Sequence, residues 1–282
     1  MVRSLREHWP EYLAEAAGLG LLMAATGLFA TLLFAPASPL AGRLPGGLAR
    51  RAMMGVAMGS TALALIHSPW GRRSGGHFNP AMTVTFWRLG KVAGWDAVFY
   101  AAAQLAGGVA GVLAVTAVLG PVFVAPPVRS AVTAPGMAGA AAAFAAELAI
   151  SAGLMGAVLL VSNSPRHHRF TGCVAAALLA LFITFEAPLS GTSMNPARSF
   201  AAALPAGVWT GFWIYLLAPP AGMLLAGRIY VARRGAAAVH CAKLDHRGSS
   251  RCIFHCRYAE LAAAAAMTAD GCPVDPKSLH KQ

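Results

Sequence analysis

The sequence predicts an all-α membrane protein built from six membrane-crossing helices and two shorter helices, arranged as two inverted halves. Three observations lead to this fold class. Hydrophobic residues form 57% of the 282-residue chain and charged residues only 11%, whereas a soluble domain carries about 25% charged residues. Long apolar stretches recur along the chain. The tripeptide Asn-Pro-Ala occurs twice, as Asn79-Pro80-Ala81 and Asn195-Pro196-Ala197, in matching places of the two halves.

Six apolar stretches are expected to cross the bilayer. They cover residues 13–34, 52–67, 97–119, 138–161, 170–185 and 208–231. A membrane-spanning helix needs about 20 apolar residues, so the second and fifth must borrow flanking residues. Each half holds three spans, and an odd number means that the second half is inserted upside down. The first stretch is too long for a cleavable signal peptide, so we expect it to stay in the mature protein.

Both Asn-Pro-Ala tripeptides are predicted to begin short helices. Asparagine is a preferred N-cap, and proline suits the first helical position because its missing N–H would be unpaired there. The apolar runs that follow, residues 82–89 and 199–204, predict helices of roughly 8–12 residues, or about 12–18 Å. That is about half of a ~30 Å hydrocarbon core. We therefore expect two half-helices that enter from opposite faces, with their positive N-terminal ends and both asparagine amides meeting near the midplane.

Two acidic residues occupy equivalent positions in the predicted membrane region. Glu15 and Glu147 each lie near the start of the first span of a half. Two roles are open: a proton relay, or a structural role in which each carboxylate accepts N–H bonds from the unwound loop before a half-helix. The pairing of one glutamate with one such loop in each half favours the structural role. Asp96 and Glu186 lie at the predicted span ends, where we expect water to reach them.

The distribution of basic residues predicts the orientation. The side of the membrane that holds both termini collects most of them, including Arg72, Arg73, Arg166 and Arg169. The positive-inside bias therefore places both termini in the cytoplasm of a multi-pass protein of the cell membrane, which we expect to be a bacterial inner membrane. The net charge of +12 is explained by this topology and by anionic lipid, and no nucleic acid partner is expected.

The segments around the two tripeptides resemble the aquaporin and aquaglyceroporin family, also called major intrinsic proteins. The resemblance covers about residues 10–232 and depends on residues 74–83 and 191–200 together with Glu15 and Glu147. It implies a right-handed six-helix bundle, a pore in every protomer and a homotetramer. It also implies a passive channel for water, in which both asparagines and Arg198 exclude protons and ions. We expect no enzyme activity, because no nucleophile with a base and no nucleotide loop is found at an interpretable spacing.

The same resemblance assigns four residues to a narrow selectivity filter. They are Met58, or Gly59 if the loop is aligned without an insertion, then Ile183, Thr192 and Arg198. Water-specific relatives carry an aromatic residue and a histidine at the first two positions, so the apolar pair here favours glycerol, urea or another small neutral solute. Ser199 stands where glycerol-conducting relatives commonly place aspartate, which argues for water. Water is retained as the leading substrate, with a glycerol or small-solute facilitator as the alternative.

The chain is expected to divide into a channel domain, residues 1–232, with repeat halves at about 10–120 and 138–232, and a basic tail, residues 233–282. The tail is rich in cysteine and histidine, and in a reducing cytoplasm its thiols are not expected to form disulfides. Two interpretations are open: a mobile or membrane-apposed tail, or a Zn²⁺ or redox site. The candidate ligands are Cys241, Cys252, His255 and Cys256. A membrane-anchored metal or redox sensor is the alternative function of another class; otherwise no cofactor is expected.

Overall fold

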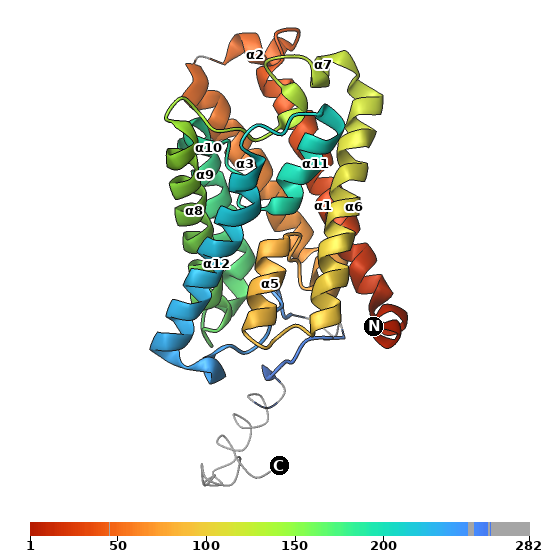
Figure 1. Cartoon of the computed structure of the whole chain (residues 1–282), viewed down its shortest axis with the longest axis vertical. Helices are drawn as coiled ribbons and strands as arrows, with labels where there is room; N and C mark the ends of the chain where they lie inside the picture. Colours follow the sequence, from red (N-terminus) through yellow and green to blue (C-terminus); the bar gives the residue numbers. More distant parts are fainter. Residues whose placement is uncertain (45, 248–250, 259, 261–282) are drawn as a thin grey trace.

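A computed structural model describes residues 1–44, 46–247, 251–258 and 260. Six long helices lie side by side as a bundle (Figure 1): α1 (Val2–Phe34), α3 (Gly46–His67), α6 (Gly94–Leu119), α8 (Gly139–Ser162), α9 (Thr171–Phe185) and α12 (Phe212–Arg234). Two half-helices, α5 (Pro80–Arg88) and α11 (Pro196–Ala206), run from the middle of the bundle toward opposite ends. The short helices are α2 (Pro39–Arg43), α4 (Pro69–Ser74), α7 (Pro121–Val124) and α10 (Ala187–Ser190). No strand occurs within these described residues.

The six predicted spans match the six long helices. Five helices are long and apolar enough to cross a membrane. For α9 this span begins at His168, three residues before the helix itself. The remaining one, α3, has 22 residues but carries Arg50 and Arg51 near its start, which lowers its apolar character. Helix α1 begins at Val2, well before the predicted residue 13, because a helix can continue past the apolar core toward water.

Within each half, the helices pack through equivalent contacts between small residues. Helix α1 packs against α6, and α8 packs against α12. A Cβ atom at Gly107 would lie 2.0 Å from the Ala16 carbonyl oxygen, and one at Gly222 would lie 2.3 Å from that of Leu148. Only glycine fits at such backbone approaches, and small residues serve this purpose at helix contacts in membranes. The equivalent helix pairs of the two halves are therefore both held in close backbone contact by glycine.

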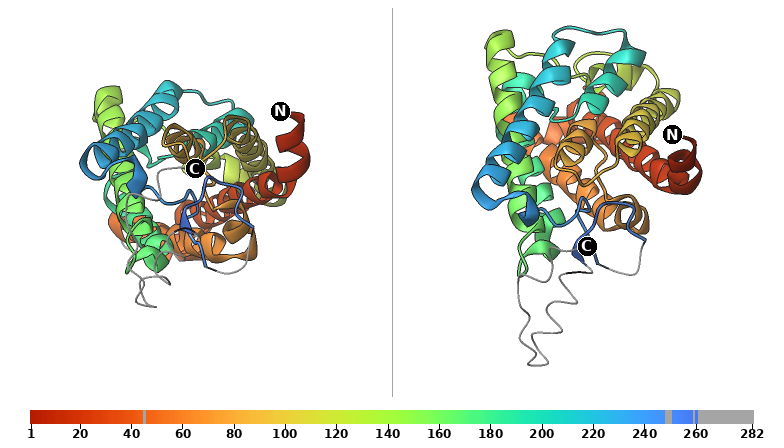
Figure 2. Two further views of the ribbon diagram at one scale, coloured as in Figure 1. Left: turned by 90° about the horizontal axis from the view of Figure 1, so that it is seen from below. Right: turned by 60° about the horizontal axis from the view of Figure 1, so that its bottom comes forward.

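After α12 the chain turns back and crosses the end of the bundle that holds the N-terminus, called the N-terminal end below (Figure 2). Val239, Ala242, Leu244 and Phe254 are buried in the same apolar core as residues of the bundle. The expectation of a mobile or membrane-apposed tail is therefore wrong for this part of the chain. The sequence misled because the apolar tail residues are few and widely spaced, so their burial depends on distant partners. Cys272, the last of the five cysteines, lies outside the described residues.

Candidate functional site

The two asparagines of the repeated tripeptide cap the half-helices. Asn79 Oδ1 accepts the Ala81 N–H at 2.9 Å. Asn195 Oδ1 accepts the N–H groups of Ala197 at 3.0 Å and Arg198 at 3.3 Å. Pro80 and Pro196 occupy the first helical positions. These are the predicted helix starts, and they leave both side-chain amide nitrogens directed away from their own helices.

Each asparagine then bonds to the loop that precedes the other one. Asn79 Nδ2 donates to the Met194 carbonyl oxygen at 2.7 Å, and Asn195 Nδ2 donates to the Phe78 carbonyl oxygen at 2.7 Å. An amide nitrogen carries two hydrogens. Among the described residues each amide uses only one of them. Two donor hydrogens are therefore left at the meeting point of the half-helices.

Glu15 holds the loop before α5. Its Oε1 accepts the His77 N–H at 3.1 Å and the Ser74 hydroxyl at 2.6 Å. Its Oε2 accepts the Phe78 N–H at 2.6 Å and the Gln104 amide at 2.7 Å. Phe78 has a φ of 46°, in the left-handed region that L-residues seldom adopt. The carboxylate bonds hold the loop in that conformation.

Glu147 holds the loop before α11 in the same way. It accepts the N–H groups of Ser193 at 2.6 Å and Met194 at 2.7 Å, and the Ser190 hydroxyl at 2.7 Å. Met194 has a φ of 52°. Both glutamates thus make the loop contacts expected from sequence for a structural role, and neither lines the cavity between the halves. A proton relay through the cavity would require them to face it.

A cavity of about 540 Å³ runs between the two halves. Most of its wall is apolar, and Asn79 and Asn195 both line it. All four residues assigned to the filter by resemblance also face this cavity, namely Met58, Ile183, Thr192 and Arg198. Arg198 Nη1 is buried and has no hydrogen-bond partner among the described residues. The geometry therefore brings the sequence candidates of both halves into one space.

Met54 also lines the cavity and was missed from the sequence. A Cβ atom at Gly55 would lie 2.4 Å from the Ala180 carbonyl oxygen, and Arg51 Nε donates to the Thr184 carbonyl oxygen at 3.0 Å. These contacts place Met54 at about the level of Ile183, with Met58 one turn nearer to the asparagines. Counting back from Asn79 misjudges this level, because α4 takes up six residues.

The alternative filter position, Gly59, faces helix α9 and not the cavity. A Cβ atom there would lie 2.7 Å from the Ala176 carbonyl oxygen. The expectation that water reaches Asp96 and Glu186 at the span ends is also wrong. Asp96 and Glu186 are only 1% and 8% exposed; Asp96 accepts the Tyr12 hydroxyl at 2.7 Å and Glu186 accepts that of Thr192 at 2.5 Å.

Another buried acid, Glu11, was missed from the sequence. It lies one helical turn before Glu15 and is 0% exposed. Arg73 Nε donates to its Oε1 at 3.0 Å. The spacing of four residues, which places Glu11 and Glu15 on one face of α1, was the available signal.

The tail reaches the cavity at the N-terminal end. The Leu244 N–H donates to the Gly75 carbonyl oxygen at 3.0 Å, and the Leu244 side chain lines the cavity. His77 Nε2 lies 2.8 Å from the Ala242 carbonyl oxygen, which can only accept, so the imidazole donates this bond. The Phe254 ring stacks on the His77 ring with centroids 5.5 Å apart. The tail thus covers the loop that leads to Asn79.

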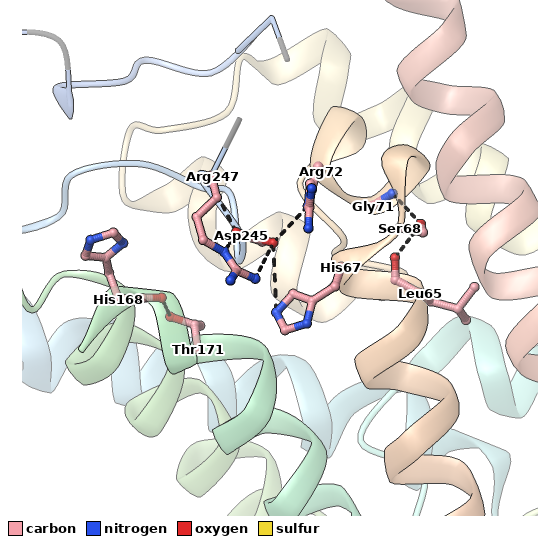
Figure 3. A network of polar contacts seen from close by, with 9 residues as sticks. All are labelled: Leu65, His67, Ser68, Gly71, Arg72, His168, Thr171, Asp245 and Arg247. Carbon is pink, nitrogen blue, oxygen red and sulfur yellow. Dashed lines mark hydrogen bonds and ion pairs between the residues drawn. The ribbon is translucent and has the colours of Figure 1, made fainter. Parts of the chain in front are cut away.

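Asp245 fixes this segment to the end of the bundle, as Figure 3 shows. It accepts bonds from Arg72 Nε at 3.1 Å and Arg247 Nε at 2.9 Å, and His67 Nε2 lies 3.9 Å away. Burial acts to raise the pKa of the Asp245 carboxyl, but the hydrogen bonds from Arg247 outweigh it and the pKa is lowered. The group is therefore ionised at neutral pH and holds both arginines.

Four metal-ligating side chains of the tail gather in one place. The ligand atoms of Cys241, His246, Cys252 and Cys256 all lie within 4.8 Å of one another. His255, a candidate from the sequence, is not among them: its Nδ1 lies 2.8 Å from the Gly90 carbonyl oxygen. His246 takes its place. His255 lies at the centre of a tight turn, in which the Cys256 N–H donates to the Phe254 carbonyl oxygen at 2.7 Å, and its side chain bonds to Gly90 instead of joining the cluster.

The fold and the cavity define a helical membrane channel with two half-helices in an inverted repeat. The family model described as "Major intrinsic protein" matches residues 2–230. The chain therefore belongs to the major intrinsic protein family, and its fold is the aquaporin-like bundle that the resemblance implied. It is a membrane transport protein.

Individual relatives agree with this assignment. Aquaporin NIP3-1 of Zea mays is 32% identical over 208 residues, which cover 73% of this chain and 67% of that protein. Aquaporin-4 of Dipodomys merriami is 34% identical over 172 residues, which cover 60% of this chain and 52% of that protein. The X-ray structure of the aquaglyceroporin from Plasmodium falciparum aligns with a TM-score of 0.64 at 21% identity, over 79% of this chain and 96% of that one. These relatives come from plants, animals and a parasite, so they give no support to a bacterial inner membrane.

Proposed function

We propose that this protein is a passive water channel that excludes protons and ions. The observation that carries the proposal is the pair of amide hydrogens left by Asn79 and Asn195 in a cavity with mostly apolar walls. A water molecule there accepts from both amides and finds few other partners. Its own hydrogens then point away along the file, so it cannot take a proton from the next water.

Electrostatics supports the same conclusion. The N-terminal ends of α5 and α11 each contribute roughly half a positive charge where they meet. Arg198 adds a full charge on the first turn of α11. Positive potential of this kind raises the barrier to protons and cations, an effect for which aquaporins are a known example. Neutral molecules are not repelled.

Water remains the leading substrate, and a glycerol or small-neutral-solute facilitator is the alternative. We propose a filter formed by Ile183, Thr192 and Arg198 with Met54 at the same level and Met58 one turn deeper. Flexible methionines give a wall that adapts to its contents, which favours passage of larger neutral solutes. The fold likeness to an aquaglyceroporin carries no weight for substrate.

Osmotic light scattering on proteoliposomes tests the function. We expect chelator-treated vesicles that contain the protein to shrink faster than empty vesicles in a gradient of an impermeant solute. A glycerol gradient decides between the two substrates. Proton leak, measured with a pH-sensitive dye, should equal that of empty vesicles. A leak that rises with protein content would refute the exclusion mechanism.

The remaining assignments are proposals that follow from family membership and charge. We propose a homotetramer with one pore in each protomer, a channel domain over residues 1–232 and a tail over residues 233–282. Both termini would face the cytoplasm, because the N-terminal end carries the larger share of basic residues. Cross-linking in membranes and protease access to the tail test these points. The alternative of a membrane-anchored sensor gains no support from the relatives, which are channels by name.

A further inference from the structure

The cysteine and histidine cluster of the tail has the composition and size of a structural zinc site. Three thiolates and one imidazole form a common tetrahedral ligand set for Zn²⁺. With Zn–S bonds of about 2.3 Å, two sulfur ligands of a tetrahedron lie about 3.8 Å apart. Cys241 Sγ lies 3.5 Å from Cys252 Sγ, and His246 Nε2 lies 3.1 Å from Cys256 Sγ. Small movements of the side chains would admit the ion.

Neighbouring groups support the cluster as a built site. The Tyr258 N–H donates to Cys256 Sγ at 3.5 Å, and the Tyr258 ring lies 4.4 Å from the His246 ring. The Tyr258 hydroxyl donates to the Ser162 carbonyl oxygen at 2.6 Å. Outer contacts of this type orient metal ligands. Here they also fasten the cluster to the end of helix α8.

The residues that cover the cavity lie between the ligands in the sequence. Ala242 and Leu244 belong to the short loop between Cys241 and His246, and Phe254 lies between Cys252 and Cys256. Ala242 and Phe254 contact His77, and Leu244 bonds to Gly75 and lines the cavity. One ion bound by all four ligands would therefore join the ends of both loops. It would also hold Ala242, Leu244 and Phe254 in place.

We propose that the tail binds Zn²⁺ through Cys241, His246, Cys252 and Cys256, and that the bound ion holds residues 242–244 across the N-terminal end of the pore and closes it. The closure rests on the proposed channel function, whereas the metal site does not. Neither covering loop has a regular helix or strand. A metal that binds only the folded form supplies folding energy to such a segment. Removing the ion should release the loops and open the pore.

The metal site is tested on the full-length protein in detergent. We expect about one zinc ion per chain by elemental analysis, and a Co²⁺-substituted protein with the visible absorption of tetrahedral thiolate ligation. Cys252→Ser and His246→Ala should lose most of this binding. Cys173→Ser, at an exposed thiol outside the cluster, and His255→Ala should keep it. Co²⁺ spectra without thiolate bands, or equal binding in all four variants, would overturn the site.

The closure is tested by water flux in proteoliposomes, with chelator or Zn²⁺ supplied on both sides. We expect chelation to raise the flux of the full-length protein several-fold, and Zn²⁺ to reverse the rise. Cys252→Ser should give the high flux with or without chelator. Leu244→Ala should bind zinc normally yet leak water, because it removes the side chain that reaches the cavity. Zinc-bound and zinc-free protein with equal flux would overturn the closure.

A truncated chain, residues 1–238, that remains monodisperse in detergent separates this inference from the channel function. It should conduct at least as well as the chelated full-length protein. If the truncated and chelated proteins both match empty vesicles while zinc still binds, the proposed channel function fails and the metal site stands. If the truncated protein conducts and chelation has no effect, the closure fails and the channel stands.

Discussion

Replacing Arg198 by alanine removes the positive charge nearest to Asn195 within the cavity. A monovalent cation that passes at about 4 Å meets a repulsion of about 4 kcal/mol at an effective dielectric constant of 20. That energy corresponds to roughly a thousandfold in rate. The half-helix ends keep part of the barrier, so we expect the cation or proton leak of Arg198→Ala to rise between roughly tenfold and a thousandfold.

The variant should remain folded, because the Arg198 guanidinium donates no hydrogen bond to a buried acceptor among the described residues. Water flow should persist, and glycerol flow should rise because the shorter side chain widens the constriction. Water, glycerol and proton fluxes would be measured at matched protein density in chelator-treated vesicles. Arg198→Lys restores a charge, so it should suppress the leak. Arg88→Ala makes the same charge change outside the cavity, at the far end of α5.

Unchanged proton and glycerol fluxes in a folded Arg198→Ala protein would show that Arg198 is not at the constriction. A leak of equal size in Arg88→Ala would show that the effect comes from net charge and not from position. Either result would remove the proposed filter, including its assignment to Ile183 and Thr192.

Glu15→Gln leaves two of the four donors to this side chain without their acceptor, at about 1–3 kcal/mol each; we expect a clear fall in the unfolding temperature in detergent, and an unchanged midpoint would contradict the structural role. Gly55→Leu should prevent assembly of α3 on α9, seen as loss of a monodisperse peak in size-exclusion chromatography, whereas Gly156→Leu, where a Cβ meets nothing within 4 Å, should not. Met54→Phe should lower glycerol flux more than Met58→Phe, and the reverse order would place the constriction one turn deeper.

The centre of the channel could be predicted from sequence because its signals are local and duplicated. Asparagine before proline defines each half-helix start within three residues, and the repeat supplies the partner. The structure places both caps and both loop-binding glutamates accordingly. The duplication also showed that Glu15 and Glu147 occupy equivalent positions, and this equivalence favoured a structural role for both.

Features that depend on contacts between distant segments could not be predicted. The burial of Phe254 against His77 joins residues far apart in the sequence, and no periodic pattern marks it. The choice of His255 over His246 followed closeness in sequence, whereas a tight turn centred on His255 separates its side chain from that of Cys256. Met54 was missed because the six residues of α4 lie between α3 and Asn79, so a count back from Asn79 ends too near to Asn79.

The crossed amide bonds of Asn79 and Asn195 have a consequence for how such a protein can change. Each half contributes a donor to the backbone of the other, so sliding or tilting one half against the other would break both bonds together. The part of the pore that selects among permeating molecules is therefore rigid, and it tolerates little change in the relative position of the two halves. The ends of the bundle carry no such constraint, and segments added there can alter when the channel conducts without altering what it conducts.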